Sequence, residues 1–239
     1  MTCRLHYFER VSSTMDVIHQ LASEGAAAGT AVIAAEQLEG RGSRGRTWHS
    51  PIGGLWLSLV FRPPTVEGIE VISLRVGLAV AEAIQARVPK PLQLKWPNDL
   101  MLGGRKLGGV LCEARWQGEA LGWVAVGLGM NVRNRIPDEL GTIAVSLSEL
   151  IPGITVEEIA DPVLAALRKL DLGTGRLSPA ELRGFARRDW LRGRTIREPV
   201  VGRVTGIGED GALLVRAASG SDVSLRSGTV ELAAASHSR

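Results

Sequence analysis

The residues best suited to chemistry in this chain gather first in the loop of residues 40–51. It opens with Gly-Arg-Gly-Ser-Arg-Gly-Arg, and Trp48 follows. Glycines let backbone amides approach phosphate oxygens, and arginines add charged, bidentate donors. The flat face of Trp48 offers a surface on which a base can stack. These parts suit a mobile loop that covers a nucleotide, although a solvated basic loop is an equal alternative on composition alone.

The same loop also matches the glycine pattern of dinucleotide-binding folds at residues 40–45. Such folds need a helix directly after the glycines, so that its N-terminus faces the pyrophosphate. Residues 46–51, Arg-Thr-Trp-His-Ser-Pro, do not favour a helix. The sequence therefore argues against a Rossmann fold but keeps the phosphate-binding chemistry.

Two lysines stand in segments that also suit phosphate binding. Lys95 begins Lys-Trp-Pro-Asn-Asp, in which Asp99 could hold Mg²⁺ beside a phosphate. The alternative is a turn whose polar side chains only satisfy backbone groups. Lys106 begins an apolar strand, where it either extends to the edge or points into a cavity. Gly109 and its neighbour Gly108 remove bulk there, so a ligand could lie close to the backbone.

Hydrophobic patterning indicates which elements position these segments. Apolar or alternating runs predict strands at residues 4–9, 30–37, 55–61, 92–96, 100–102, 106–116 and 121–127. Helical spacing predicts four helices: one from residue 13 to about residue 28, and three over residues 70–87, 156–170 and 179–191. Because neighbouring strands are mostly linked as hairpins, we predict an α+β fold with a mixed, largely antiparallel sheet flanked by helices.

Local signals mark several of the boundaries. Ser13 and Asp16 fit a capping box at the start of the first helix, and Gly29 is expected to stop it. Gly103 and Gly104 predict a hairpin turn. After Trp190 the chain changes to short strands separated by glycine-rich turns, which predicts a small β-barrel-like unit. We therefore expect two domains, residues 1–190 and 191–239.

Composition limits the class of protein. Hydrophobic residues make up 45% and charged residues 22%, as in a soluble globular protein. No apolar run is long enough to span a bilayer, the first residues do not form a signal peptide, and two cysteines do not make a disulfide framework. The net charge is only +3, and the dense basic cluster is Arg41, Arg44 and Arg46. We expect a cytoplasmic protein that binds no membrane.

Together these segments resemble the biotin–protein ligase family. The matching segments are, in order, Ser13-Thr14, Gln37 with GRGSRGRTWHSPIGGLWLS, KWPND, RKLGGVLCE, GLGMNV and the C-terminal β unit. The resemblance implies the class II aminoacyl-tRNA-synthetase-like fold of biotin and lipoate ligases with an SH3-like C-terminal barrel. It also implies that ATP and Mg²⁺ activate biotin to biotinyl-5′-AMP. A lysine of a biotin carboxyl carrier protein then takes the biotin.

The resemblance also implies roles for individual residues. Lys106 would hold the biotin carboxylate and then the acyl-phosphate, Lys95 would contact the ATP phosphates, and Arg41 would contact the adenylate. These three are the expected catalytic residues, and Asp99 is the expected Mg²⁺ partner. The apolar walls would come from residues 55–59 and 110–112. The expected substrate-binding residues are Ser13, Thr14, Met15, Gln37, Gly40, Arg41, Gly42, Ser43, Arg44, Trp48, Lys106, Gly109 and Asn131.

Two positions depart from the family pattern. Met15 stands where the family commonly has Asn, so a hydrogen bond to biotin is lost or replaced by packing. Ser43 stands where the family commonly has an Arg that helps to hold the reactive adenylate. We predict weaker retention of the adenylate here, unless the neighbouring Arg44 substitutes for that arginine.

Some family members carry an N-terminal helix-turn-helix domain and act as repressors. The catalytic resemblance begins near residue 13, so we expect a monofunctional ligase that binds no DNA. A homodimer is an expectation from the family. Three alternatives stay open: a lipoate–protein ligase, a nucleic-acid-binding module that uses the arginine cluster, and a biotin-binding protein without catalysis.

Overall fold

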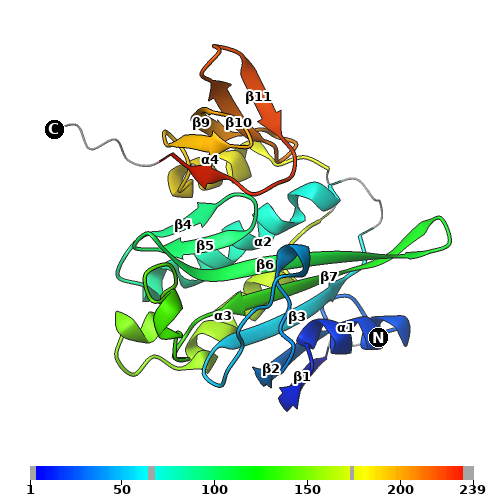
Figure 1. The fold of residues 1–239 in the computed structure, drawn as a ribbon. Coiled ribbons are helices and arrows are strands. Elements are labelled where there is room, and N and C mark those ends of the chain that lie inside the picture. The colour runs from blue at the N-terminus through cyan, green and yellow to red at the C-terminus, as the bar shows by residue number, and fades with distance from the viewer. Residues whose placement is uncertain (1–3, 64–67, 173–174, 234–239) are drawn as a thin grey trace.

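The computed structural model describes residues 4–63, 68–172 and 175–233, and Cys3 lies outside them (Figure 1). Within this part of the chain, the large sheet has the strand order β1-β2-β3-β7-β6-β5-β4. Only β1 and β2 are parallel among its neighbouring pairs, which confirms the mixed, largely antiparallel sheet. Its strands are β1 (Leu5–Val11), β2 (Ala31–Gln37), β3 (Leu55–Phe61), β4 (Leu92–Lys95), β5 (Asp99–Leu102), β6 (Arg105–Gln117) and β7 (Ala120–Met130).

Helices cover both faces of this sheet (Figure 1). Helix α1 (Thr14–Ser23) lies on one face, and α2 (Ile69–Ile84) and α3 (Val156–Arg168) lie on the other. Successive residues of β3 face different apolar clusters: Val60 packs beneath α1, whereas Leu59 belongs to the larger core around α2. The period of two in a strand thus gives the sheet two buried faces.

Helix α1 begins as predicted but is shorter. The Ser13 hydroxyl accepts a hydrogen bond from the Met15 amide at 3.3 Å, which caps the helix. The Asp16 carboxylate, expected to complete a capping box, forms an ion pair with Arg41 instead. The helix ends at Ser23 rather than near residue 28, because the chain turns through a positive φ of 91° at the following Gly25.

Other boundaries follow tertiary pairing. Strand β7 runs three residues beyond its expected end, because it pairs with β3 and β6 as far as Met130. Helix α4 (Pro179–Arg188) ends before the expected residue 191, because the next residue, Asp189, pairs with Leu94 near the end of β4. The turn at Gly103 and Gly104 is confirmed, with φ values of 59° and 83°. No helix among the described residues has the length and apolar character that crossing a bilayer requires.

A second, antiparallel sheet follows α4, with the order β11-β10-β9-β8-β12, and it lies next to β4 and α4 (Figure 1). The Trp96 indole donates to the Gly211 carbonyl at 3.0 Å, and the apolar core is continuous across the junction. This small sheet fits the expected SH3-like unit, while the boundary at residue 190 stays a prediction. Its strands are β8 (Thr195–Glu198), β9 (Gly202–Ile207), β10 (Leu213–Ala217), β11 (Asp222–Leu225) and β12 (Glu231–Leu232).

Candidate functional site

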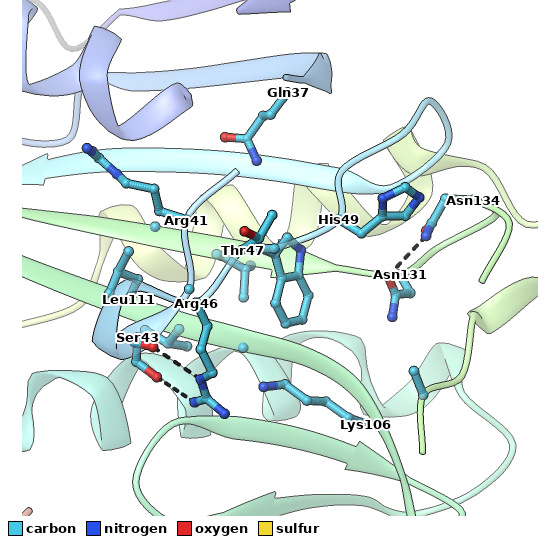
Figure 2. Close-up of a pocket in the computed structure, with 18 of the residues that line it drawn as sticks. Gln37, Arg41, Ser43, Arg46, Thr47, His49, Lys106, Leu111, Asn131 and Asn134 are labelled. Atoms are coloured by element: carbon cyan, nitrogen blue, oxygen red, sulfur yellow. Dashed lines mark hydrogen bonds between the residues drawn. The ribbon is translucent and has the colours of Figure 1, made fainter. Parts of the chain in front are cut away.

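A pocket of about 510 Å³ opens beside the N-terminus of α1, where the loop of residues 40–51 passes over β6 and β7 (Figure 2). Gln37 and Lys106 lie on opposite sides of it (Figure 2). The structure brings most of the predicted residues together here: Ser13, Thr14, Met15, Gln37, Arg41, Gly42, Ser43, Trp48, Lys106, Gly109 and Asn131 all line the pocket. Gly40 and Arg44 line an adjoining cavity. Lys95 and Asp99 line neither cavity, although Asp99 contacts the lining residue Lys106.

One end of the pocket is a hydrogen-bonded polar network around Gln37. Its Oε1 accepts from the Thr14 amide at 2.8 Å and from the Thr14 hydroxyl at 2.9 Å. Because the one proton of the Thr14 hydroxyl is donated to Gln37, the hydroxyl of the fully buried Ser58 must be the donor in the 2.8 Å bond between Ser58 and Thr14. Sequence analysis missed Ser58, although the only polar side chain in the buried strand LWLSLVF was a usable signal.

The same network fixes the orientation of the Gln37 amide. The Thr14 backbone N–H can only donate, so the Gln37 oxygen must face it and the nitrogen must face the other way. Nε2 then donates to Ser50 at 2.8 Å. One N–H of Nε2 is left for a ligand, and a carbonyl oxygen is the group that it suits.

Met15 contributes packing rather than a polar contact. Its side chain is buried in the apolar cluster beneath α1, and its Sδ lies 2.9 Å from the point that a Cβ on Gly127 would occupy. Leu57, Val110 and Leu111 add to the apolar lining on this side. Burial raises the pKa of the neighbouring Cys112 thiol to about 12, so this cysteine is not a nucleophile.

Two cations of the pocket are already paired: Lys106 at the end opposite Gln37, and Arg41 beside α1 (Figure 2). Lys106 Nζ lies 2.6 Å from Asp99 Oδ1. Their strands meet in an irregular register, with a shift between Leu100 and Met101. Arg41 lies 2.8 Å from Asp16 and 3.9 Å from Glu113. Both cations are therefore held by carboxylates of the chain itself.

Trp48 lies over Lys106, with Nζ 5.0 Å from the ring centroid. Its Nε1 is buried and has no hydrogen-bond partner among the described residues. A Cβ on Gly129 would lie 2.5 Å from this nitrogen, and one on Gly109 would lie 3.6 Å from the ring. The glycines of β6 and β7 thus leave room for the indole to rest on the sheet.

Glu113, beside Arg41, also accepts from His19. The His19 Nδ1 accepts from Trp123 Nε1 at 3.0 Å, so Nε2 carries the proton and donates to Glu113 at 2.9 Å. Burial lowers the pKa of His19, more than its hydrogen bond with Glu113 raises it. Neutral His19 therefore does not compete with Arg41 as a positive partner of Glu113.

Arg46, not Arg44, is the arginine that lies with Ser43 at the pocket. Arg44 adopts a φ of 63° and donates from its guanidinium to Thr229 in the C-terminal unit. Arg46 lines the pocket near Lys106, and it donates to the Ser43 hydroxyl at 2.9 Å and to the Ser43 carbonyl at 3.2 Å (Figure 2). The hypothesis that Arg44 replaces the family arginine therefore lacks geometric support.

Lys95 lies at the junction with the C-terminal unit, and its Nζ is 5.3 Å from the ring centroid of Trp190. Burial lowers its pKa below the usual value of a lysine. Asp99 raises the pKa, while Lys106 and Arg46 lower it further. These interactions show that Lys95 shares one electrostatic environment with the cation end of the pocket.

The far side of the pocket was only partly expected. Asn131 lines it as predicted, and its Oδ1 accepts from Asn134 at 3.0 Å. No periodic pattern indicated the turns after β7 that complete this wall. The lining residues that sequence analysis did not assign include Arg46, Thr47, His49, Asn98, Asn134, Ile136, Pro137, Glu139, Leu140, Ile143 and Ala144.

A magnesium ion fits this site only as a partner of the nucleotide. The described residues contain no group of three or more His, Cys, Asp or Glu side chains that could hold a metal. Mg²⁺ commonly uses one or two carboxylates together with substrate phosphates. Asp99, beside the cation end, can supply one such carboxylate.

Comparison with known proteins places this geometry in a family. Residues 7–131, just over half of the chain, match the model of the biotin/lipoate A/B protein ligase family. The chain belongs to this family. Residues 192–233 match the biotin protein ligase C-terminal domain.

Several members of the biotin/lipoate ligase family are similar to this chain over most of its length. The biotin–[acetyl-CoA-carboxylase] ligase of Paracoccus denitrificans is 32% identical over 219 residues, which are 80% of this chain and 86% of that protein. The bifunctional ligase/repressor BirA of Bacillus subtilis is 32% identical over 231 residues, 90% of this chain and 70% of the relative. The biotin protein ligase of Aquifex aeolicus, solved with biotin and ATP, has a TM-score of 0.80 at 29% identity, covering 96% and 98% of the two chains.

Proposed function

We propose that this chain is an ATP-dependent biotin–protein ligase. It activates biotin to biotinyl-5′-AMP and transfers the biotin to a lysine of a biotin carboxyl carrier protein. One observation carries the proposal: a single pocket joins a buried polar network, apolar walls and a cluster of cations. These parts match the ureido ring, the valeryl chain and the acyl-phosphate of biotinyl-5′-AMP.

In the first step, a biotin carboxylate oxygen attacks the α-phosphorus of ATP, and the bond to pyrophosphate breaks. Lys106 would meet the carboxylate end of biotin, and it would exchange Asp99 for the developing acyl-phosphate. Arg41 would likewise leave Asp16 for the adenylate. Positioned cations favour this step because negative charge builds up on the transferring oxygens. Bound Mg²⁺ would neutralise phosphate charge beside Asp99.

In the second step, the ε-amine of the acceptor lysine attacks the acyl carbon. The carbon–oxygen bond to AMP breaks, and the amine loses a proton as the amide forms. Trp48 and its loop would cover the adenylate and keep water from the acyl carbon. Ser13, Thr14 and Gln37 would hold the ureido ring, and Asn131 would contact the nucleotide.

The polar network favours biotin over lipoate. The dithiolane ring of lipoate has no oxygen that could accept the remaining Gln37 N–H, which would then lack a strong hydrogen-bond partner. A ureido carbonyl can accept it. A homodimer, a cytoplasmic location and the lack of a DNA target remain predictions.

Biotin-dependent exchange between ATP and labelled pyrophosphate tests the first step directly. We expect exchange with biotin and much less with lipoate at equal concentration. Transfer of labelled biotin to a carrier domain then tests the second step. Absence of exchange would reject the proposed activation, and preference for lipoate would favour the alternative ligase. Binding of biotin without exchange or transfer would indicate a non-catalytic binding protein.

A further inference from the structure

Asn134 is a buried side chain in the turn that follows β7, and it is only 3% exposed. Its Oδ1 accepts from the Val132 amide at 3.1 Å, and its Nδ2 donates to Asn131 Oδ1 at 3.0 Å. Asn131 and Asn134 both belong to the far wall of the pocket (Figure 2). Two hydrogen bonds therefore hold Asn134 between the backbone of the turn and the side chain of Asn131.

The direction of these two bonds is fixed by the backbone. A backbone N–H only donates, so the oxygen of Asn134 must face Val132 and its nitrogen must face Asn131. An amide nitrogen also only donates, so the Asn131 atom that it meets must be the oxygen. The nitrogen of Asn131 therefore points away from Asn134 (Figure 2). Asn134 thus determines which end of the Asn131 amide is offered to a ligand.

The backbone of the turn already has its own partners. The Asn131 amide donates to the Leu107 carbonyl at 2.9 Å, and the Asn131 carbonyl accepts from the Leu147 amide at 3.1 Å. The Val132 carbonyl accepts from the Ser146 hydroxyl at 2.6 Å. Asn131 Nδ2 has no hydrogen-bond partner among the described residues, although this residue is only 6% exposed. Because buried polar groups are nearly always bonded, this nitrogen requires an acceptor on a ligand.

The same wall suits a base better than a phosphate. It includes the apolar residues Ile136, Pro137, Leu140 and Ile143, together with the carboxylate of Glu139. A carboxylate repels a phosphate, and apolar side chains do not solvate one. A planar base has apolar faces for such a wall, and its ring nitrogens accept hydrogen bonds.

We propose that Asn134 is a positioning residue that holds the N–H groups of the Asn131 amide toward the base of the nucleotide. This end of the pocket then selects a base that offers a ring nitrogen as acceptor. Asn131 makes the contact, and Asn134 acts only through Asn131. The inference rests on the proposed function for the identity of the ligand as ATP.

The test turns the Asn131 amide round. In Asn134→Asp the carboxylate still accepts from Val132 but cannot donate, so Asn131 must turn its nitrogen toward the new carboxylate. The Asn131 oxygen then opposes the acceptor of the base. By titration calorimetry without biotin, we expect the Kd of the α,β-methylene analogue of ATP, with Mg²⁺, to rise by about tenfold or more. Asn134→Ala frees the amide, should raise this Kd by about threefold, and serves if Asn134→Asp does not fold.

A double-mutant cycle separates positioning from other effects of the substitution. Asn134→Asp adds a charge, and Asn134 itself could touch the nucleotide, but both effects would persist without the Asn131 amide. We expect Asn134→Asp, or Asn134→Ala in its place, to change the Kd by less than about twofold in the Asn131→Ala background. An equal loss of affinity in the two backgrounds would overturn the inference.

Analogues of ATP that lack one ring nitrogen test the contact itself. The 1-deaza, 3-deaza and 7-deaza analogues each carry a C–H in place of one acceptor. We expect at least one of them to bind the native chain about tenfold more weakly than ATP. This penalty should disappear in the Asn134 variant, because the amide no longer offers its N–H groups there. Equal binding of ATP and all three analogues to the native chain, or an unchanged penalty in a folded variant, would contradict the proposal.

Gln85→Glu is the matched control. Gln85 Oε1 accepts from the Leu92 amide at 3.0 Å, and its Nε2 donates to the Lys90 carbonyl at 3.2 Å, so the same exchange of amide for carboxylate is made away from the pocket. Its Kd for the ATP analogue should stay within about twofold of the native value. A rise equal to that of Asn134→Asp would overturn the inference. Failure of pyrophosphate exchange with these binding results retained would reject only the proposed catalysis.

Discussion

The two ends of the pocket differ in how their polar groups are paired before a ligand binds. At the Gln37 end, the buried hydroxyls and amides bond to one another, and one N–H is left over. At the Lys106 end, cations pair with carboxylates of the chain, and the buried Nε1 of Trp48 has no partner among the described residues. The first end needs no exchange of partners, because its spare N–H can take a ligand directly, whereas the second must exchange partners to bind one.

Burial explains the difference. An unpaired buried polar group costs about 1–3 kcal/mol, so the buried Thr14 and Ser58 bond to each other and to Gln37 before any ligand binds. The ion pairs of Lys106 and Arg41 are partly exposed, and such pairs contribute only about 0–1 kcal/mol. A phosphate can replace these carboxylates at little cost. The comparison predicts that variants at the two ends affect different ligands.

Lys106→Ala should have the largest effect. It removes the cation expected to hold the acyl-phosphate and leaves Asp99 without that partner. We expect kcat/KM in pyrophosphate exchange to fall by about 10²–10³-fold. Lys90→Ala, at an exposed lysine, is the control and should keep native activity. Near-native exchange in Lys106→Ala would contradict the assignment of this end to phosphate chemistry.

Thr14→Val tests the opposite end. Valine keeps the shape of threonine but removes the hydroxyl between Ser58 and Gln37. We expect the Kd for biotin to rise by about tenfold, which corresponds to about 1.4 kcal/mol. The Kd for the ATP analogue without biotin should stay within about twofold. Thr205→Val removes an exposed hydroxyl that donates to the Leu214 carbonyl and serves as the control. An equal loss of affinity for biotin and for the ATP analogue would contradict the assignment of the two ends to different ligands.

Ser43→Arg should improve retention of the adenylate at the cation end. A guanidinium at this position would add bidentate donors beside Arg46. We expect the native chain to release biotinyl-5′-AMP about threefold to tenfold more than the variant, measured by chromatography of the released product. Arg44→Ala should leave the release unchanged, because Arg44 contacts Thr229. Equal release from the native chain and Ser43→Arg would contradict the prediction.

Lys95→Arg should have the smallest effect, on pH dependence. Burial lowers the pKa of Lys95 below the usual 10.5, so its positive charge is present at low pH and is lost earlier than usual as the pH rises. We expect the KM for ATP to rise on the alkaline side. Arginine stays protonated, so this rise should move to higher pH in Lys95→Arg. If the KM for ATP rises at the same alkaline pH in Lys95→Arg as in the native chain, Lys95 is not the group whose titration causes the rise.

The sequence by itself determined the local chemistry of this protein. The glycine–arginine loop, the turn at Gly103 and Gly104, and the runs that became β2 and β3 follow from residue type and spacing over a few positions. Most of the predicted substrate-binding residues do line the pocket, because the matching segments occur in a specific order. The end of α1 was not predicted, because the chain turns at Gly25 rather than at the expected Gly29. The partner of Asp16 was not predicted either, since it depends on a contact outside the helix.

Only the tertiary structure decided which of these groups meet. Thr14 and Ser58 are 44 residues apart, and their hydrogen bond depends on how α1 packs on β3. The pairing of Lys106 with Asp99 depends on the irregular register of β5 and β6. The backbone at Arg44 sends its side chain to Thr229 and leaves Arg46 at the pocket. Sequence patterns are local, whereas the partner of a buried polar group is set by register and packing.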